Sequence, residues 1–112
     1  MKPAKKETGR SAPSTQRRVT RDLVDFKARA TSRGGTYGLQ IVNISPLGLM
    51  ARVESPLSAG DHLLIELPHV RSIESVVRWA EDGRIGVEFA RGIDADHYAM
   101  MLTFMPQRQT SW

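Results

Sequence analysis

The stretch that decides the fold runs from residue 72 to residue 90 and reads SIESVVRWAEDGRIGVEFA. Apolar and polar residues alternate on both sides of Asp82-Gly83, and such alternation is typical of half-buried β-strands. An Asp-Gly pair favours the two-residue turn of a β-hairpin. The sequence therefore predicts two antiparallel strands, at 72–80 and 84–90, joined by a tight turn.

The same alternation extends toward the N-terminus and adds four more strands. Turn-forming residues separate the apolar-alternating segments from one another. The predicted strands lie at 22–31, 37–43, 49–54 and 62–67. About six short antiparallel strands predict an all-β fold, a small closed or split barrel, because closure removes the exposed edges of a sheet.

After Gly92 the pattern changes to that of a helix, predicted over 93–105. Asp94 and Asp96 lie in its first turn, where negative charge favours the helix dipole. Apolar side chains then follow at helical spacing, and Pro106 ends the segment. We expect this helix to cover one end of the barrel, within a domain that spans 17–105 and precedes a C-terminal tail at 106–112.

Length and composition limit the kinds of protein this chain can be. A chain of 112 residues suits one domain, and the lack of cysteine excludes disulfides and thiolate metal sites. The apolar runs are far shorter than the roughly 20 residues of a membrane helix. The basic N-terminus lacks the apolar stretch of a secretory signal, so the expected location is the cytoplasm.

The positive charge is concentrated in the first fifth of the chain. Residues 1–21 carry seven Lys or Arg side chains against Glu7 alone, whereas residues 22–112 carry nine basic and eleven acidic side chains. A slightly acidic body argues against a broad DNA-binding face. Residues 1–16 hold no large apolar side chain after Met1, and we therefore expect a disordered basic tail there.

The residues available for catalysis are few. His62, His69 and His97 lie far apart in the sequence and form no HxxxH or HxH pair, so no metal site is predicted. Ser45 lies outside any GxSxG motif, and the chain has no P-loop. We therefore expect a protein that is not an enzyme and has no cofactor.

Two short motifs indicate recognition of a ligand instead. Arg17 and Arg21 form an RxxxR motif together with Arg18, and guanidinium groups bind phosphate and stack on nucleobases. Residues 43–48, Asn-Ile-Ser-Pro-Leu-Gly, form an NxSxxG motif at the end of a predicted strand. Its Asn and Ser offer donors and acceptors for a base edge, and its Gly permits a tight turn or a close backbone approach. Together these groups suit a compact purine anion.

The chain resembles the PilZ domain family of bacterial receptors for the second messenger cyclic di-GMP. The resemblance rests on RxxxR followed by (D/N)xSxxG, and on a closing hairpin at 77–89, VRWAEDGRIGVEF. It implies a six-stranded antiparallel split β-barrel with a C-terminal helix. It also implies that Arg17, Arg18 and Arg21 bind the phosphates and stack on guanine, that Asn43 and Ser45 bond to a guanine edge, and that Gly48 shapes the turn.

Trp79 is a further candidate for a ligand contact, although its alternation with Ile73 and Val77 favours a place in the core. The chain is too short for an output domain, so we expect the ligand to order the basic tail and create a surface for another protein. By resemblance that partner belongs to motility, pilus, exopolysaccharide or biofilm control. Two alternatives stay open: a scaffold of this family that binds only proteins, and a small RNA-binding barrel.

Overall fold

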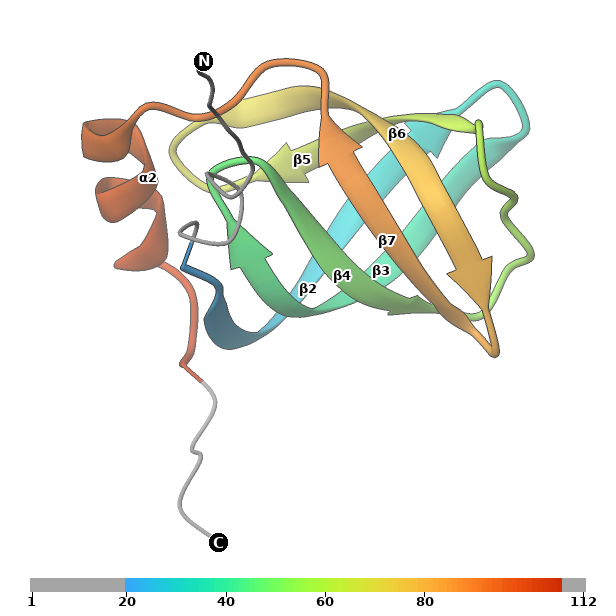
Figure 1. The fold of residues 1–112 in the computed structure, drawn as a ribbon, viewed down its shortest axis with the longest axis horizontal. Coiled ribbons are helices and arrows are strands. Elements are labelled where there is room, and N and C mark those ends of the chain that lie inside the picture. The colour runs from blue at the N-terminus through green and yellow to red at the C-terminus, as the bar shows by residue number, and fades with distance from the viewer. Residues whose placement is uncertain (1–19, 108–112) are drawn as a thin grey trace, which may run out of the picture.

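A computed structural model describes residues 20–107, which form six β-strands and one α-helix (Figure 1). The elements are β2 (Asp22–Ser32), β3 (Gly35–Ser45), β4 (Gly48–Val53), β5 (His62–Leu67), β6 (Arg71–Glu81), β7 (Arg84–Phe89) and α2 (Ala95–Leu102). Each predicted strand is present, with ends that differ by a few residues. The six-stranded antiparallel barrel with a C-terminal helix is thus confirmed.

The strands close into a barrel in the order β2-β3-β4-β7-β6-β5. Every neighbouring pair is antiparallel, and four of the connections join strands that are consecutive in the sequence. The barrel closes where β5 meets β2, through the pairs Ala30–Ile65 and Thr31–Leu64. This seam is short, and nearer the start of β2 the residues Val24 and Asp25 pair with Gln107 and Pro106 instead.

The β6–β7 hairpin turns at the predicted place. Asp82 and Gly83 both have positive φ, 55° and 78°, as a two-residue turn that matches the strand twist requires. The pairing between β6 and β7 shifts once, between Val77 and Trp79. Such a bulge adds one residue to one strand and turns the side chains beyond it to the opposite face.

The core fills the barrel and extends beneath the helix. Its buried side chains are mostly aliphatic and come from all six strands, with Leu39, Ile41, Ile44, Leu49, Ile65 and Ile85 among the largest. Tyr98, Met101 and Met105 are buried as well, and helix α2 lies at one end of the barrel (Figure 1). The periodicity after Gly92 therefore identified the side that packs on the barrel.

Helix α2 is shorter than predicted, because it begins at Ala95 rather than at residue 93 and ends at Leu102 rather than at residue 105. Asp94 is its N-cap and accepts a hydrogen bond from the His97 amide, so Ile93 lies outside the helix. Residues 103–105 continue as turns with hydrogen bonds to carbonyls three residues earlier. Across residues 20–107, no helix has the length and apolar character needed to span a membrane.

The chain beyond the helix returns to β2. Asp25 donates its amide to the Pro106 carbonyl over 3.0 Å, and Gln107 forms an isolated antiparallel bridge with Val24. The first two residues of the predicted C-terminal tail are therefore held against the barrel. The predicted basic tail at 1–16 lies outside the described residues.

Candidate ligand-binding site

The two sequence motifs meet where β2 begins and β3 ends. Arg21 Nη1 donates a hydrogen bond to Asn43 Oδ1 over 2.9 Å, although the two residues are 22 positions apart. The pairing of β3 with β4 shifts between Ile41 and Asn43, and this irregularity places Asn43 opposite Met50. Asn43 is half-buried, and its Nδ2 lies 3.9 Å from the Met50 sulfur. The last arginine of RxxxR thus contacts the first residue of NxSxxG.

Ser45 is used within the turn that joins β3 to β4. It is buried, its Oγ accepts a hydrogen bond from the Leu47 amide over 3.2 Å, and its hydroxyl lies 3.4 Å from the Gly48 carbonyl as a donor. A hydroxyl has one proton and two lone pairs. These two bonds therefore leave one acceptor position on Ser45.

Gly48 is required by the close approach of β4 to β7. A side chain at this position would collide with the Val87 carbonyl, and its Cβ would lie 3.3 Å from the Glu88 Cα. Backbone atoms cannot swing aside as the end of a long side chain can. Of the two roles that the sequence allowed for this glycine, the structure shows the close backbone approach.

Trp79 does not lie in the core, so the expectation from its alternation with Ile73 and Val77 was wrong. The bulge between Val77 and Trp79 is the physical reason, because it turns the indole to the outer face. Trp79 is 41% exposed and covers Gly86, which has no side chain to keep the ring away.

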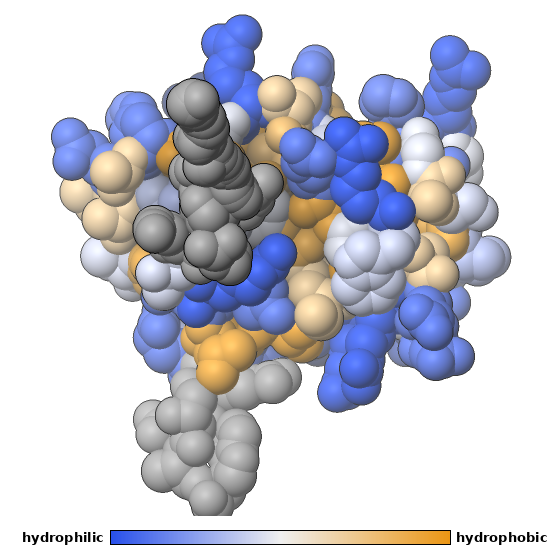
Figure 2. All heavy atoms as spheres, viewed as in Figure 1, coloured by the Kyte–Doolittle hydropathy of each residue, from blue (hydrophilic) through white to orange (hydrophobic). Residues whose placement is uncertain are grey.

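These residues line one pocket on the outer face of the barrel, here called the motif pocket. It has a volume of about 440 Å³, and its walls include Arg21, Asn43, Ser45, Gly48 and Trp79. The volume falls within the range of small-molecule sites. Figure 2 views this side of the barrel and shows apolar surface between hydrophilic side chains. Arg17 and Arg18 lie outside the described residues, so their predicted contacts stay predictions.

Sequence reasoning missed a second arginine in the motif pocket. Arg78 lines it, and its Nε forms an ion pair with Glu88 Oε1 at 2.6 Å. Both side chains are more than half exposed, so solvent screens this pair. Because the hairpin turn fixes the register of β6 on β7, the sequence could have predicted that Arg78 and Glu88 lie close together. Nothing in the sequence predicted that this hairpin lies next to Asn43.

Tyr98 connects helix α2 to both motifs. Its hydroxyl lies 2.5 Å from Asp22 Oδ2 and 2.9 Å from the Ile44 carbonyl oxygen. Burial raises the pKa of the Tyr98 hydroxyl well above its ordinary value, and the hydrogen bond and charge of Asp22 raise it further, while Arg21 acts in the opposite direction. The phenol therefore stays protonated and donates. Asp22 follows Arg21, and Ile44 lies between Asn43 and Ser45.

The fold and this pocket together define a small antiparallel barrel with a pocket on its outer face that is lined by polar side chains and two arginines. A family model for the PilZ domain matches residues 15–105, which include the RxxxR motif, all six strands and the helix. The chain belongs to the PilZ domain family. No curated protein matches the chain in a sequence search. PilZ domains generally bind cyclic di-GMP, and they are binding or adaptor domains rather than enzymes.

Proposed function

We propose that this chain binds cyclic di-GMP in the motif pocket and relays the signal to another protein. The observation that carries the proposal is the convergence of Arg21, Asn43, Ser45 and Gly48 on one outer face. These residues come from two segments that both lie within residues 15–105, the range that the family model matches. The pocket combines guanidinium donors, which bind phosphate, with an exposed indole, on which a purine can stack.

In this proposal the arginines supply the charge and the strand residues supply base recognition. Arg21 has five N–H donors, and its bond to Asn43 uses one. The others face the phosphates together with Arg17 and Arg18, and the flat guanidinium groups stack on guanine. Asn43 and the remaining acceptor of Ser45 bond to a guanine edge. Gly48 keeps β4 close to β7, and Trp79 offers a second stacking surface.

The relay follows from where the arginines lie in the chain. Arg17 and Arg18 precede β2 by a few residues, so a ligand held by them and by Asn43 fixes that segment across the barrel face. Fixing a segment in this way is one of the common forms of switching. The new surface is then available to a partner protein.

Isothermal titration of the full chain with cyclic di-GMP tests the proposal. We expect Arg17→Ala and Arg21→Ala each to weaken binding by about 10-fold to 100-fold, because each removes a hydrogen bond between charged groups. Arg29→Ala is the matched control, since Arg29 is an exposed arginine of β2 outside the motif pocket. It should leave the affinity unchanged.

Unchanged affinity in both arginine variants would reject the proposed site. A wild-type chain that does not bind cyclic di-GMP would favour a scaffold that contacts only proteins. RNA binding is separated by salt, because several phosphate contacts make affinity fall steeply as salt concentration rises. Binding of one dinucleotide with two phosphates should depend on salt much less.

A further inference from the structure

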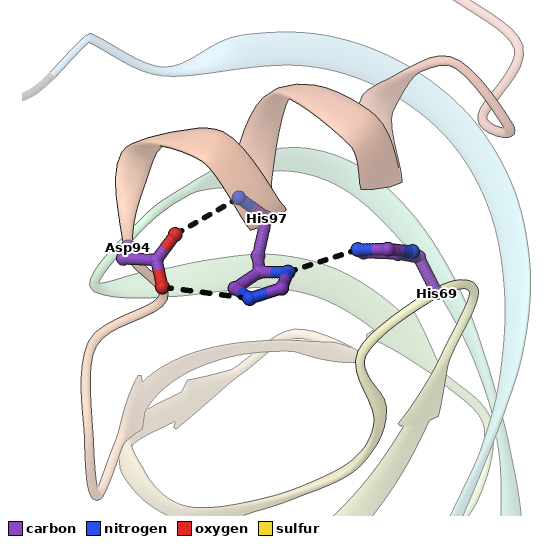
Figure 3. A network of polar contacts seen from close by, with 3 residues as sticks. All are labelled: His69, Asp94 and His97. Carbon is purple, nitrogen blue, oxygen red and sulfur yellow. Dashed lines mark hydrogen bonds and ion pairs between the residues drawn. The ribbon is translucent and has the colours of Figure 1, made fainter.

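A pair of histidines faces each other at the end of the barrel, outside the motif pocket. His69 lies in the turn between β5 and β6, and His97 lies in the first turn of α2. His69 Nε2 is 3.0 Å from His97 Nδ1, and the two ring centroids are 5.1 Å apart. Figure 3 shows the two rings with these nitrogens turned toward one another. We call these two residues the histidine pair.

Asp94 orients the His97 ring from the other side. Its Oδ1 accepts the His97 amide over 2.9 Å as the helix N-cap, and its Oδ2 lies 3.7 Å from His97 Nε2 (Figure 3). A carboxylate beside one imidazole nitrogen favours the tautomer with the proton on that nitrogen. His97 Nδ1 then has a lone pair directed at His69. In metal sites a carboxylate often accepts the second ring N–H of a histidine ligand, and Asp94 Oδ2 lies on that side of His97 at 3.7 Å.

The backbone at His69 is held in an unusual conformation. Its φ is 68°, and the Val70 amide donates to the Pro68 carbonyl over 2.7 Å, which forms a three-residue turn centred on His69. Three-residue turns with a positive φ at the centre are rare and strained. Backbone strain concentrates at functional sites. This turn carries the imidazole that faces His97.

We propose that His69 Nε2 and His97 Nδ1 bind one divalent transition-metal ion, Cu²⁺ or Ni²⁺. Two nitrogens 3.0 Å apart, each about 2.0–2.1 Å from a shared ion, subtend an angle of about 94° at that ion. This angle suits neighbouring positions of square-planar Cu²⁺ or Ni²⁺ better than the wider tetrahedral angle of zinc. Both rings stay neutral when the ion binds, because His69 moves its remaining proton to Nδ1.

The rest of the coordination sphere is open to solvent. Within residues 20–107, no group of three or more His, Cys, Asp or Glu side chains is placed to hold an ion. Both histidines line a pocket of about 750 Å³ between the β5–β6 turn, α2 and the loop that precedes it. Water, or a ligand group that enters this pocket, completes the coordination. A bound ion would fasten α2 to the β5–β6 turn.

Titration of the full chain with Ni²⁺ and with Cu²⁺ tests this site. We expect one ion per chain at the histidine pair, and at least a 10-fold loss of affinity in His69→Asn and in His97→Gln. Asparagine tolerates the positive φ of residue 69, so the turn survives the first substitution. His62→Gln is the matched control, because His62 is an exposed histidine outside the pair. It should bind as the wild type does.

Shared coordination has a signature that two separate sites lack. The double variant of His69 and His97 should lose less binding free energy than the sum of the two single losses, and the electron paramagnetic resonance of bound Cu²⁺ should show two coupled imidazole nitrogens. Asp94→Asn keeps an N-cap and should weaken binding several-fold. Additive losses, one coupled nitrogen, or an equal loss in His62→Gln would overturn the proposal. Circular dichroism of each variant checks that the barrel is folded.

Discussion

The motif pocket and the histidine pair are encoded in the sequence in different ways. The motif pocket is built from short segments in which each functional residue lies within a few positions of the next, such as residues 43–48. The histidine pair joins two residues that are 28 positions apart, one in a turn and one in a helix. A site whose residues lie in short segments can therefore be recognised as a motif. A site whose residues come from distant segments at the end of the barrel leaves no such pattern in the sequence.

The largest effect that would separate the two regions is expected at Gly48. Gly48→Ala should reduce the free energy of unfolding by about 2–3 kcal/mol, because the new methyl group collides with the backbone at Val87. Chemical denaturation measures this change. The substitution should also weaken cyclic di-GMP binding, while the ring resonances of His69 and His97 in NMR spectra stay at their wild-type positions.

Gly38→Ala is the control for that experiment. Gly38 is an exposed residue of β3, and a Cβ added there would meet no other atom within 4 Å. Its substitution should change the free energy of unfolding by less than about 1 kcal/mol. Equal losses in the two variants would show that the β4–β7 approach is not the reason for glycine at position 48.

The strand pattern could be predicted because each strand has one face in the core. Alternation gave the position of all six strands, and Asp82-Gly83 gave the hairpin. Alternation alone could not predict the shift in strand pairing within the hairpin or the exact end of α2. The bulge between Val77 and Trp79 depends on how two strands fit together, so a strict period of two placed Trp79 on the wrong face. The end of α2 was missed because Met105 is buried at helical spacing, although the amides of residues 103–105 bond to carbonyls three rather than four residues earlier.

A second test addresses the link between the motif pocket and α2. Tyr98→Phe removes the hydroxyl that contacts Asp22 and the Ile44 carbonyl, and should cost about 1–2 kcal/mol of stability. Thermal or chemical unfolding measures the loss. Cyclic di-GMP affinity should fall a few-fold, because Ile44 lies between two proposed ligand contacts. A variant with unchanged stability and affinity would show that this contact does not position the site.

The same hydroxyl predicts how stability depends on alkaline pH. Burial raises the pKa of Tyr98 above its ordinary value of about 10, so the unfolded chain loses this proton at a lower pH than the folded chain does. The stabilising contribution is fully present below about pH 10 and falls by about 1.4 kcal/mol per pH unit above it. Denaturation at pH 9 and pH 11 should therefore show a smaller decline in Tyr98→Phe. Equal declines would contradict the assignment.

The sequence predicted only those residues of the candidate site that belong to a short motif. Arg21, Asn43, Ser45 and Gly48 follow from two motifs, and the structure brings them to one pocket. Arg78 and Tyr98 were missed because their roles depend on which elements lie beside β3 and β4. Tyr98 has the spacing of a core residue in the sequence, and its burial agrees with that interpretation. Only the neighbouring Asp22 carboxylate and Ile44 carbonyl give it a polar role.

The smallest effect concerns the charge balance of the motif pocket. Glu88→Gln removes the partner of Arg78, and because the pair is exposed, stability should change by less than about 1 kcal/mol. Arg78 would then be available to a phosphate, and one negative charge would be gone from the pocket wall. Affinity for cyclic di-GMP should rise a few-fold in isothermal titration, most clearly at low salt.

Glu66→Gln, an exposed change on β5 outside this pocket, should have no such effect. A rise of the same size in both variants would mean that net charge, rather than the Arg78–Glu88 pair, controls the attraction of the anion.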